Sequence, residues 1–418
     1  MVRLKRLLLV AFFLVTFCFG WLYVVSSRAQ VVSLASDGVV RVPSDYSSIT
    51  EALAHALDGY TIVVEPGVYN EYHMEVNRTV KIVGMNRDGV IVNGSGTSDF
   101  IFKVDADNVV IENLTLQNTI LTGEFASAVY LYNVINVTIK NLFIRNVLHG
   151  FQLVRSNFSQ ISSNHLMGCN RGVFIRDSSC NNTIVGNTFE AVSTVIYIAD
   201  SNSQYSKVFH NNFVSTNLTV FAAMSFFDSG YPQGGNYWSN HFAADLNHGP
   251  GQNLTGSDGI FDEAYPSYYD PLDKYPFVHP FSILDVAVEE TSFEVYISSN
   301  ATLGSYNFNV SGKSLTLILN GVAGSSGSCR VLIPKGLLSC VSLGDWSVLC
   351  DGENVSYLYP YEDEYFTYLY FSYVQSTSSK IQIVGAWAVI EFSVLMFLFL
   401  FLVCILSIVG IKIKCGNV

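Results

Sequence analysis

The fold is decided by residues 128–198, which read AVYLYNVINVTIKNLFIRNVLHGFQLVRSNFSQISSNHLMGCNRGVFIRDSSCNNTIVGNTFEAVSTVIYI. Within this stretch an apolar register starts anew every 22 residues, at Ala128, Gly150, Gly172 and Thr194. A second register is marked by asparagine, at Asn141, Asn164, Asn187 and, just beyond the stretch, Asn211. Repeats of this length are typical of solenoids, in which each repeat is one structural unit.

The residue types of the repeat indicate strands and turns. Short runs of alternating apolar residues are separated by polar turns, and no 3.6-residue period is present, which excludes a helical repeat. The fixed Leu/Asn spacing of a leucine-rich repeat is also absent. Asparagine tolerates the left-handed backbone region, and its amide can bond to the next coil, so stacked asparagines form a ladder. Because one coil cannot bury its own apolar face, the coils must stack. The pattern predicts an all-β fold, a right-handed parallel β-helix (solenoid).

The segment before the repeat predicts a cap. Residues 40–69 read as strand, short helix and strand, with Ser48 or a neighbour as the helix N-cap and Gly59 as its end. Such a helix would plug the open end of the coil stack and block edge-to-edge pairing.

Three stretches resemble known β-helix families. Residues 42–71, VPSDYSSITEALAHALDGYTIVVEPGVYNE, resemble the N-terminal cap of pectin-lyase-like proteins, and the N-x-F and G-V-x-I coils resemble NosD-type repeats. Gly234-Gly-Asn-Tyr-Trp-Ser-Asn, with Ser257-Asp-Gly-Ile-Phe-Asp and Asp273-Lys-Tyr-Pro-Phe, resembles the closing motif of archaeal NosD-like surface proteins. The closing motif is the most specific part. The resemblance covers roughly residues 38–280 and implies a β-helix domain at 30–280 with a closing segment at 234–277.

Residues 281–384 follow another pattern. Short alternating strands are separated by turns such as Gly324-Ser-Ser-Gly, which is typical of a β-sandwich. The strands are expected at 293–297, 306–310, 314–319, 330–334, 346–349 and 367–373. The stretch from Gly324 to Gly352 resembles a β-sandwich that often follows such β-helices in archaeal surface proteins. We expect this domain to be a stalk that holds the β-helix away from a membrane.

Both ends of the chain are apolar. Residues 1–29 combine a basic start with an apolar run, which predicts a signal peptide or an uncleaved signal anchor. Residues 385–411 exceed the roughly 20 residues that a transmembrane helix needs, and Lys412 and Lys414 assign the 412–418 tail to the cytoplasm. We expect a single-pass or two-pass cell-membrane protein with residues 30–384 extracellular. Eleven Asn-x-Ser/Thr sequons between the ends suit a glycosylated surface.

Charge and cysteine content limit the partners. Apart from the two terminal segments, the chain carries 16 basic and 33 acidic residues, a net charge of −17. This negative net charge argues against nucleic acid and polyanionic sugars as binding partners, unless a cation bridges them to the chain. The five cysteines of this part form two groups, whose pairing the sequence leaves open: Cys169 and Cys180, then Cys329, Cys340 and Cys350.

The repeat also predicts one outer face. With Val129 and Leu131 pointing inward, two columns point outward, namely Tyr130, Gln152, Phe174, Ile196 and Tyr132, Val154, Arg176, Ile198. Such an aromatic and aliphatic face either stacks on sugar rings or is covered by a neighbouring domain or a partner. The candidate carbohydrate-binding residues are Tyr130, Tyr132, Gln152, Phe174 and Arg176. Asp177 and Asp200, at strand ends, are interpreted as turn residues.

This face holds no carboxylate, whereas polysaccharide lyases need a base with a cation beside it and glycoside hydrolases need two clustered carboxylates. We therefore predict no catalytic residue and expect a non-catalytic module for adhesion, glycan contact or envelope architecture, with carbohydrate or envelope components as partners. A polysaccharide lyase or glycoside hydrolase is the alternative. The enzyme, unlike the non-catalytic module, requires paired carboxylates, or carboxylates with arginine, to converge on one exposed groove.

Metal binding has one candidate region. Oxygen ligands gather in the glycine-rich closing region, where Asp245, Asn247, Asp258 and Asp262, with Asp270 and Asp273 nearby, are candidate Ca²⁺ ligands. Relatives implied by the resemblance often carry a denser Asp-Gly-Asp-Gly run here, and turn-forming aspartate is the other interpretation. A copper role is not carried over from the NosD resemblance, because the histidines and methionines are scattered.

Overall fold

The computed structural model describes residues 38–214, 220–221, 225–266 and 272–389. The predicted signal segment, the predicted cytoplasmic tail and nearly all of the predicted membrane span lie outside these residues. Contacts divide the chain into residues 1–39 and 40–418, and the two folded domains described below belong to the second unit. No helix of the described residues is long and apolar enough to cross a bilayer.

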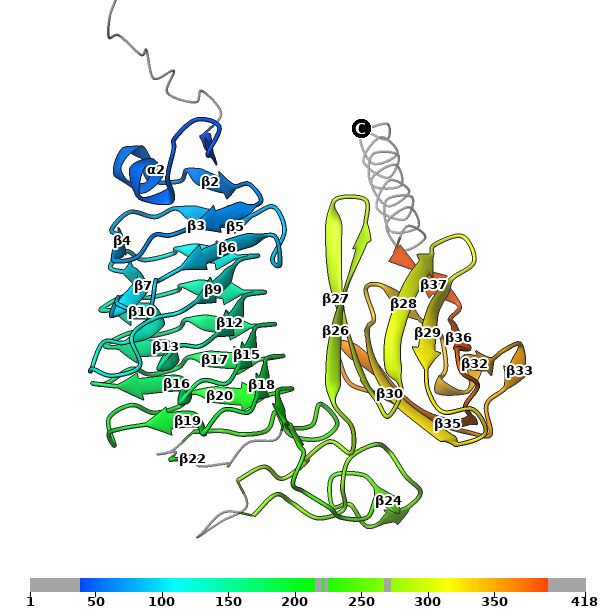
Figure 1. The fold of residues 1–418 in the computed structure, drawn as a ribbon. Helices are drawn as coiled ribbons and strands as arrows, with labels where there is room; N and C mark the ends of the chain where they lie inside the picture. The colour runs from blue at the N-terminus through cyan, green and yellow to red at the C-terminus, as the bar shows by residue number, and fades with distance from the viewer. Residues whose placement is uncertain (1–37, 215–219, 222–224, 267–271, 390–418) are drawn as a thin grey trace, which may run out of the picture. The chain divides into compact units, whose positions relative to one another are not determined.

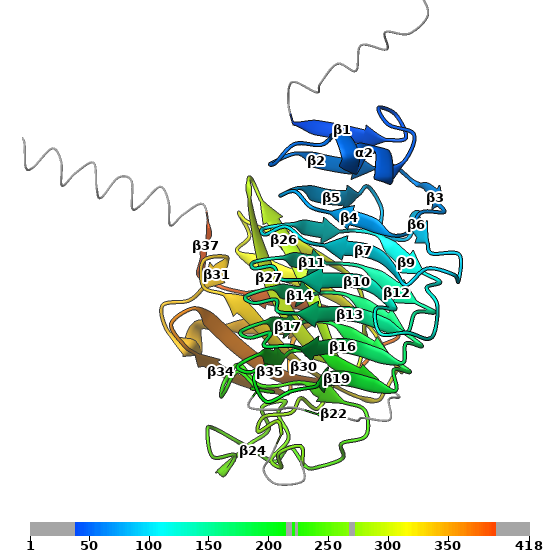
Figure 2. The same ribbon diagram turned by 90° about the vertical axis from the view of Figure 1, so that its left-hand side faces the viewer.

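Three parallel sheets form a β-helix, as predicted (Figures 1 and 2). The first sheet contains β1 (Val39–Val42), β2 (Thr61–Val64), β5 (Lys81–Gly84), β8 (Val110–Glu112), β11 (Thr138–Lys140), β14 (Gln160–Ser162), β17 (Thr183–Val185) and β20 (Lys207–Phe209). The second contains β4 (Met74–Val76), β7 (Phe100–Val104), β10 (Ser127–Tyr132), β13 (His149–Val154), β16 (Arg171–Arg176), β19 (Thr194–Ile198) and β22 (Val220–Phe221). The third contains β3 (Gly67–Tyr69), β6 (Val90–Asn93), β9 (Thr115–Gln117), β12 (Phe143–Arg145), β15 (His165–Met167), β18 (Thr188–Glu190), β21 (Asn212–Val214) and β23 (Tyr237–Trp238).

The predicted register holds for three coils and fails at the fourth. Val129, Phe151 and Val173 are paired inward neighbours, but the next partner of Val173 is Ile196. The prediction that Ile196 and Ile198 point outward was wrong, since both are buried and Tyr197 pairs with Phe174. The coil that ends there has 23 residues rather than 22, and a shift of one residue turns every side chain to the opposite face.

The N-terminal cap is present. Helix α2 (Ile49–His55) starts after Ser48, whose side chain accepts a hydrogen bond from the Glu51 amide. It ends at His55, short of Gly59, because Ala56 is already extended; Gly59, with φ of +85°, belongs to the turn that follows.

A ladder of buried asparagines runs through one turn of the solenoid. The amide N–H and the Nδ2 of Asn164 both donate to Oδ1 of Asn187, at 3.0 and 2.9 Å. The same pair of bonds joins Asn187 to Asn211 and Asn211 to Asn236. Asn141, predicted as the first member, lies one position away: Leu142 occupies the ladder position, and its amide donates to Asn164. The Asn141 Nδ2 donates instead to Asn113, in a neighbouring column.

The ladder ends on the closing segment. The amide N–H of Asn236 donates to Oδ2 of Asp273 at 2.7 Å, and the same oxygen accepts the indole N–H of Trp238 at 2.8 Å. Asp273 is fully buried, and Gly235 lies so close that a Cβ there would be 1.9 Å from the carboxylate. The closing motif therefore places a carboxylate at the end of the ladder. Its strands β24 (Asn247–His248) and β25 (Leu254–Thr255) form a short hairpin.

Two antiparallel sheets follow the solenoid. One contains β26 (Phe281–Val288), β27 (Thr291–Ser299), β30 (Ser326–Pro334), β35 (Phe366–Val374) and β34 (Tyr357–Glu362). The other contains β28 (Thr302–Asn309), β29 (Ser314–Asn320), β36 (Ser379–Val384), β32 (Ser347–Cys350) and β33 (Glu353–Asn354), with η1 (Leu343–Asp345) before β32. Apolar residues of both sheets form one core cluster, as in a sandwich, and all six expected strands are present. Strand β37 (Trp387–Ala388) pairs with β31 (Leu338–Ser339), so this domain continues past its expected end at residue 384.

The last coil is bonded to the first strand of the sandwich. Asn212 donates from Nδ2 to the Phe281 carbonyl at 2.8 Å and accepts the Phe281 amide at 2.6 Å. The ring of His210 stacks on Phe281 with centroids 4.5 Å apart. Burial lowers the pKa of His210 to about 4, so the ring is neutral at pH 7.

We expect Asn187→Ala to lower the free energy of unfolding by about 2–4 kcal/mol, because it removes buried bonds to Asn164 and Asn211 and leaves their partners unpaired. Urea denaturation of the wild type and the variant measures the change. Asn77→Ala, at an exposed asparagine, is the matched control and should change stability by less than about 0.5 kcal/mol. Equal losses in the two variants would contradict a stabilising ladder.

His210 should make stability fall in weak acid. In the unfolded chain a histidine has a pKa near 6.5, so it is protonated below that pH. In the folded state His210 stays neutral down to about pH 4, because burial lowers its pKa. Between pH 7 and pH 5 the wild type should lose about 2 kcal/mol more than His210→Gln. Denaturation at both pH values measures this difference, with exposed His55→Gln as control. Parallel pH profiles for wild type and His210→Gln would contradict it.

Candidate functional site

The residues predicted to bind carbohydrate lie together on the outer face of the second sheet. Tyr130, Gln152 and Phe174 form one column, as expected, and Tyr132 and Arg176 lie in the next. The face is not open, however. Tyr130 is 4% exposed, Gln152 0% and Phe174 9%, while Tyr132 reaches 36%. As the side chains lie, a sugar ring cannot stack on the column.

The cover comes from the chain itself. We call residues 119–126, between β9 and β10, the strap. The coil that contains it is longer than its neighbours: Phe102 to its partner Val129 is 27 residues, against 22 from Val129 to Phe151. Glu124 of the strap pairs with Arg176 at 2.8 Å, and the ring of Phe125 lies 5.7 Å from that of Tyr130. A covered face was one of the two expected outcomes, but the cover is an insertion in the preceding coil.

Besides Arg176, the covered face contains Arg171 and His149. The guanidinium of Arg171 lies 4.8 Å from the ring centre of Phe174 and 4.6 Å from that of Tyr197. His149 makes an edge contact with Phe174 at 5.4 Å. Burial, and then the charge of Arg171, lowers the pKa of His149 to about 4, so this ring is neutral at pH 7. Sequence reasoning missed His149 and Arg171 as members of this face.

The four candidate calcium ligands close turns. Asp245 accepts the amides of Asp258 and Gly259, both at 3.0 Å, and Asp262 accepts the backbone and side-chain N–H groups of Asn247. Asp258 is buried and accepts the Ile260 amide. Asp270 lies outside the described residues. Within the described ranges no three His, Cys, Asp or Glu side chains converge as metal ligands, and the calcium site stays a prediction.

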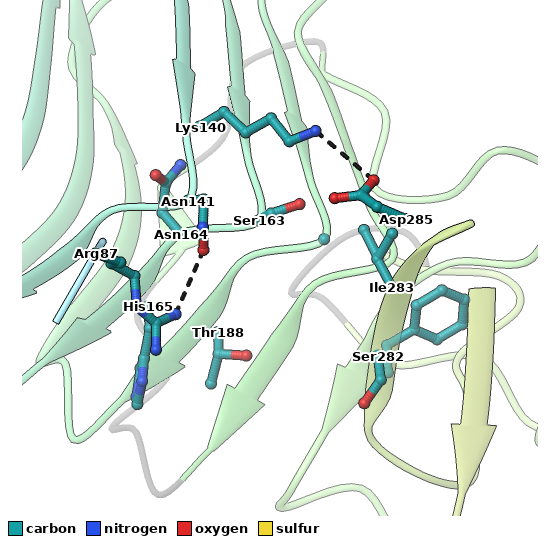
Figure 3. A pocket seen from close by; sticks show the side chains of 12 residues that line it. Arg87, Lys140, Asn141, Ser163, Asn164, His165, Thr188, Ser282, Ile283 and Asp285 are labelled. Atoms are coloured by element: carbon teal, nitrogen blue, oxygen red, sulfur yellow. Dashed lines mark hydrogen bonds and ion pairs between the residues drawn. The ribbon is translucent and has the colours of Figure 1, made fainter. Parts of the chain in front are cut away.

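A polar groove lies where β26 passes the solenoid (Figure 3). Its volume is about 350 Å³, within the range of small-ligand sites. The solenoid wall consists of Arg87, Lys140, Asn141, Ser163, Asn164, His165, Gly186 and Thr188, and the other wall of Phe281, Ser282, Ile283 and Asp285. Most of these side chains carry a hydrogen-bonding group.

The corner between the first and third sheets forms the groove because of its backbone. One residue per coil adopts the left-handed region there, with φ of +52° at Asn141, +55° at Ser163 and +66° at Gly186. This column immediately precedes the ladder position, and its three residues line the groove. At Gly186 the strand comes close, since a Cβ there would lie 2.2 Å from Cδ1 of Ile283.

Charges in and beside the groove are paired. Lys140 Nζ lies 3.8 Å from a carboxylate oxygen of Asp285 and 3.8 Å from one of Glu294, which face each other on β26 and β27. His165 Nε2 is 3.1 Å from Glu190. The guanidinium of Arg87 donates to Asn141 at 3.4 Å. Asp285 is the lining carboxylate among the described residues and already contacts a lysine, so two free carboxylates do not face each other across the groove.

The sequence did contain a trace of this groove. Three of its solenoid residues, Asn141, Ser163 and Gly186, recur at one position of successive coils, directly before the ladder. The opposite wall comes from a strand that begins about a hundred residues further along the chain. Periodicity within the repeat cannot indicate which later segment packs against a given corner.

Three comparisons relate this chain to known proteins. A family model described as "Periplasmic copper-binding protein (NosD)" matches residues 35–242, just under half of the chain. No curated protein sequence matches. Among solved structures, the catalytic domain of a GH87 α-1,3-glucanase in complex with nigerose is 16% identical with a TM-score of 0.37, covering 48% of this chain and 38% of that one. The pectin methylesterase from Yersinia enterocolitica is 18% identical with a TM-score of 0.26, covering 40% and 71%.

The described residues do not fit copper. Soft copper sites need clustered Cys, Met or His ligands. Here His210 and His241 use Nε2 on backbone carbonyl groups, His279 uses it on Ser328, and the five described cysteines belong to no shared ligand group. The similarity to the NosD model therefore extends to the coils, without a metal centre among the described residues.

We expect Gly186→Ala to lower the free energy of unfolding by about 2–4 kcal/mol, from backbone strain and from the clash with Ile283. Gly168→Ala is a matched control, because Gly168 has a φ of +65° with open space around it, and it should lose about 1–2 kcal/mol. Adding Ile283→Ala to Gly186→Ala should show a favourable coupling of about 1 kcal/mol or more in a double-mutant cycle. Additive losses would contradict the contact that closes the groove.

Proposed function

We propose that this chain is an extracytoplasmic β-helix module that binds saccharide without catalysis, and that the groove beside β26 is its binding site. One observation supports the site above others: a groove of about 350 Å³ whose walls are mostly hydrogen-bonding side chains. The description "periplasmic" of the matching family supports an extracytoplasmic location.

The chemistry of the walls favours a hydroxyl-rich ligand. Arg87 and Lys140 supply N–H donors, while Ser163, Thr188 and Ser282 supply hydroxyl groups that both donate and accept. The side chain of Asn141 adds an amide. The hydroxyl groups of a saccharide both donate and accept hydrogen bonds, whereas an apolar ligand would leave the wall groups unpaired.

The same walls disfavour hydrolysis and elimination. A glycoside hydrolase needs two carboxylates that flank the bond, one as acid and one as base or nucleophile. Among the described lining residues Asp285 is the carboxylate, and Lys140 contacts both it and Glu294. An elimination needs a base free to take a proton, and Lys140 Nζ lies 3.8 Å from an oxygen of each of these carboxylates. The enzyme alternative thus lacks a free acid–base pair here.

Attachment to a membrane is part of the proposal and rests on the sequence. The apolar run at 385–411 and the basic residues after it are its support. Along the chain, the sandwich stands between that run and the solenoid.

The test is binding of the detergent-solubilised full chain to a glycan array, followed by calorimetry with the best saccharide. Arg87→Ala and His165→Ala should each weaken the Kd by about tenfold, roughly 1.4 kcal/mol, because each removes a wall group. Arg41→Ala, an exposed arginine near the cap, is the matched control and should leave the Kd unchanged. No reducing ends or unsaturated products should form. Absence of any saccharide binding would refute the proposal, and product formation would favour the enzyme alternative.

A further inference from the structure

We propose that the strapped face of the second sheet is a second ligand site, built for a saccharide that carries one carboxylate, and that Glu124 of the strap occupies the place of that carboxylate. The site is separate from the groove and does not depend on the function proposed for it.

Three buried polar atoms on this face point to a ligand. Within the described residues, Gln152 Nε2, Arg176 Nε and His149 Nδ1 have no hydrogen-bond partner. Gln152 is 0% exposed and His149 2% exposed. Buried donors without partners are costly and rare, and they need a specific explanation. All three belong to the same face, since Gln152 lies between Tyr130 and Phe174 in one column and the ring of His149 contacts Phe174.

The identity of these atoms sets the ligand chemistry. The side-chain nitrogens of Gln152 and Arg176 are donors, so the missing partners are acceptors. Arg171 and Arg176 place two guanidinium groups against the ring of Phe174. Such a surface suits a ring-shaped ligand with several oxygen acceptors and one anionic group.

The strap already supplies one such group. A carboxylate oxygen of Glu124 lies 2.8 Å from Nη1 of Arg176. Glu124 precedes β10, whereas Arg176 belongs to β16, two coils further along the solenoid. Asp177 also lies 3.9 Å from Nη1 of Arg176, and both carboxylates leave Nε unused. A free carboxylate can take two guanidinium N–H groups side by side. A ligand carboxylate would therefore satisfy Arg176 better than Glu124 does.

The strap is attached at its ends and loosely packed between them. Its ends are fixed by backbone bonds from Ile120 to Ser98 and from Ser127 to Asp99. Between them Leu121 is 54% and Phe125 44% exposed, and Gly123 has a φ of +110° with open space around it. Loops of this kind can lift while their ends stay in place.

The net charge of the chain is compatible with one carboxylate on the ligand. Repulsion from distant acidic residues is screened beyond about 8–10 Å, while Arg171 and Arg176 act at contact distance. A polyanion would add several negative charges to a chain whose net charge, apart from the two terminal segments, is already −17. The ligand class is thus a saccharide with a single acidic group.

The test is calorimetric titration of the full chain with D-glucuronate, with D-glucose as the uncharged probe. Glu124→Gln removes the competing charge and keeps the shape of the side chain, so it should bind glucuronate about three- to tenfold more tightly than the wild type, with no gain for glucose. Adding Arg176→Ala should abolish the gain. Arg87→Ala, in the groove, should leave it intact, which separates this site from the groove.

Hydrogen exchange gives a second readout that needs no ligand. In Glu124→Gln, amides of residues 119–126 should exchange faster, while those of β13 and β16 should exchange as in the wild type. Thermal melting of each variant confirms that it is folded. The proposal is overturned if Glu124→Gln binds glucuronate no more tightly than the wild type, if the gain survives Arg176→Ala, or if glucose gains equally.

Discussion

The carboxylate of Asp273, at the end of the asparagine ladder, is the interaction on which the rest of the structure depends. Each ladder asparagine donates twice to the next one, so the donors all point the same way along the solenoid. An asparagine in place of Asp273 would need a further acceptor for its own Nδ2 group. A carboxylate accepts hydrogen bonds and has none to donate, so it can end the ladder. Burial raises the pKa of Asp273 to about 7, and the N–H groups of Trp238 and Asn236 lower it in turn. Gly235 is required beside it, because any side chain would collide with that carboxylate.

The ladder also positions the second domain and hence the groove. Asn212 follows Asn211 directly, and its amide holds the backbone of Phe281 at both the N–H and the carbonyl. The residue before Asn211 is His210, whose ring stacks on Phe281. Strand β26 therefore starts against the last coil and passes the corner formed by Ser163 and Gly186. The corner residues are left-handed for the reason that makes the ladder possible, a sharp turn between the first and third sheets.

The sequence predicted the parts of this fold that arise from local chemistry. The β-helix, the cap after Ser48, the ladder from Asn164 onward and six strands of the sandwich follow from residue type and spacing. The failures came from single residues: Asn141 sits one position before the ladder, and one extra residue before Tyr197 reversed the orientation of Ile196. The strap was signalled by a coil of 27 residues, but length alone does not show where the excess folds. The groove has a wall from a later domain, which no repeat period can indicate.

The arrangement explains why this solenoid suits contact more than chemistry. Neighbouring coils lie about 4.8 Å apart, so each face presents one side chain per step and similar groups in rows. Such rows place donors at regular distances along an extended ligand, as Asn141 and Ser163 do in the groove. Catalysis needs the opposite, two unlike groups whose environments drive their pKa values apart around one bond. One cation at each site is instead paired with a carboxylate, Lys140 with Asp285 and Arg176 with Glu124. A ligand can replace such a partner, so the ion pairs that make these surfaces poor active sites leave them able to bind.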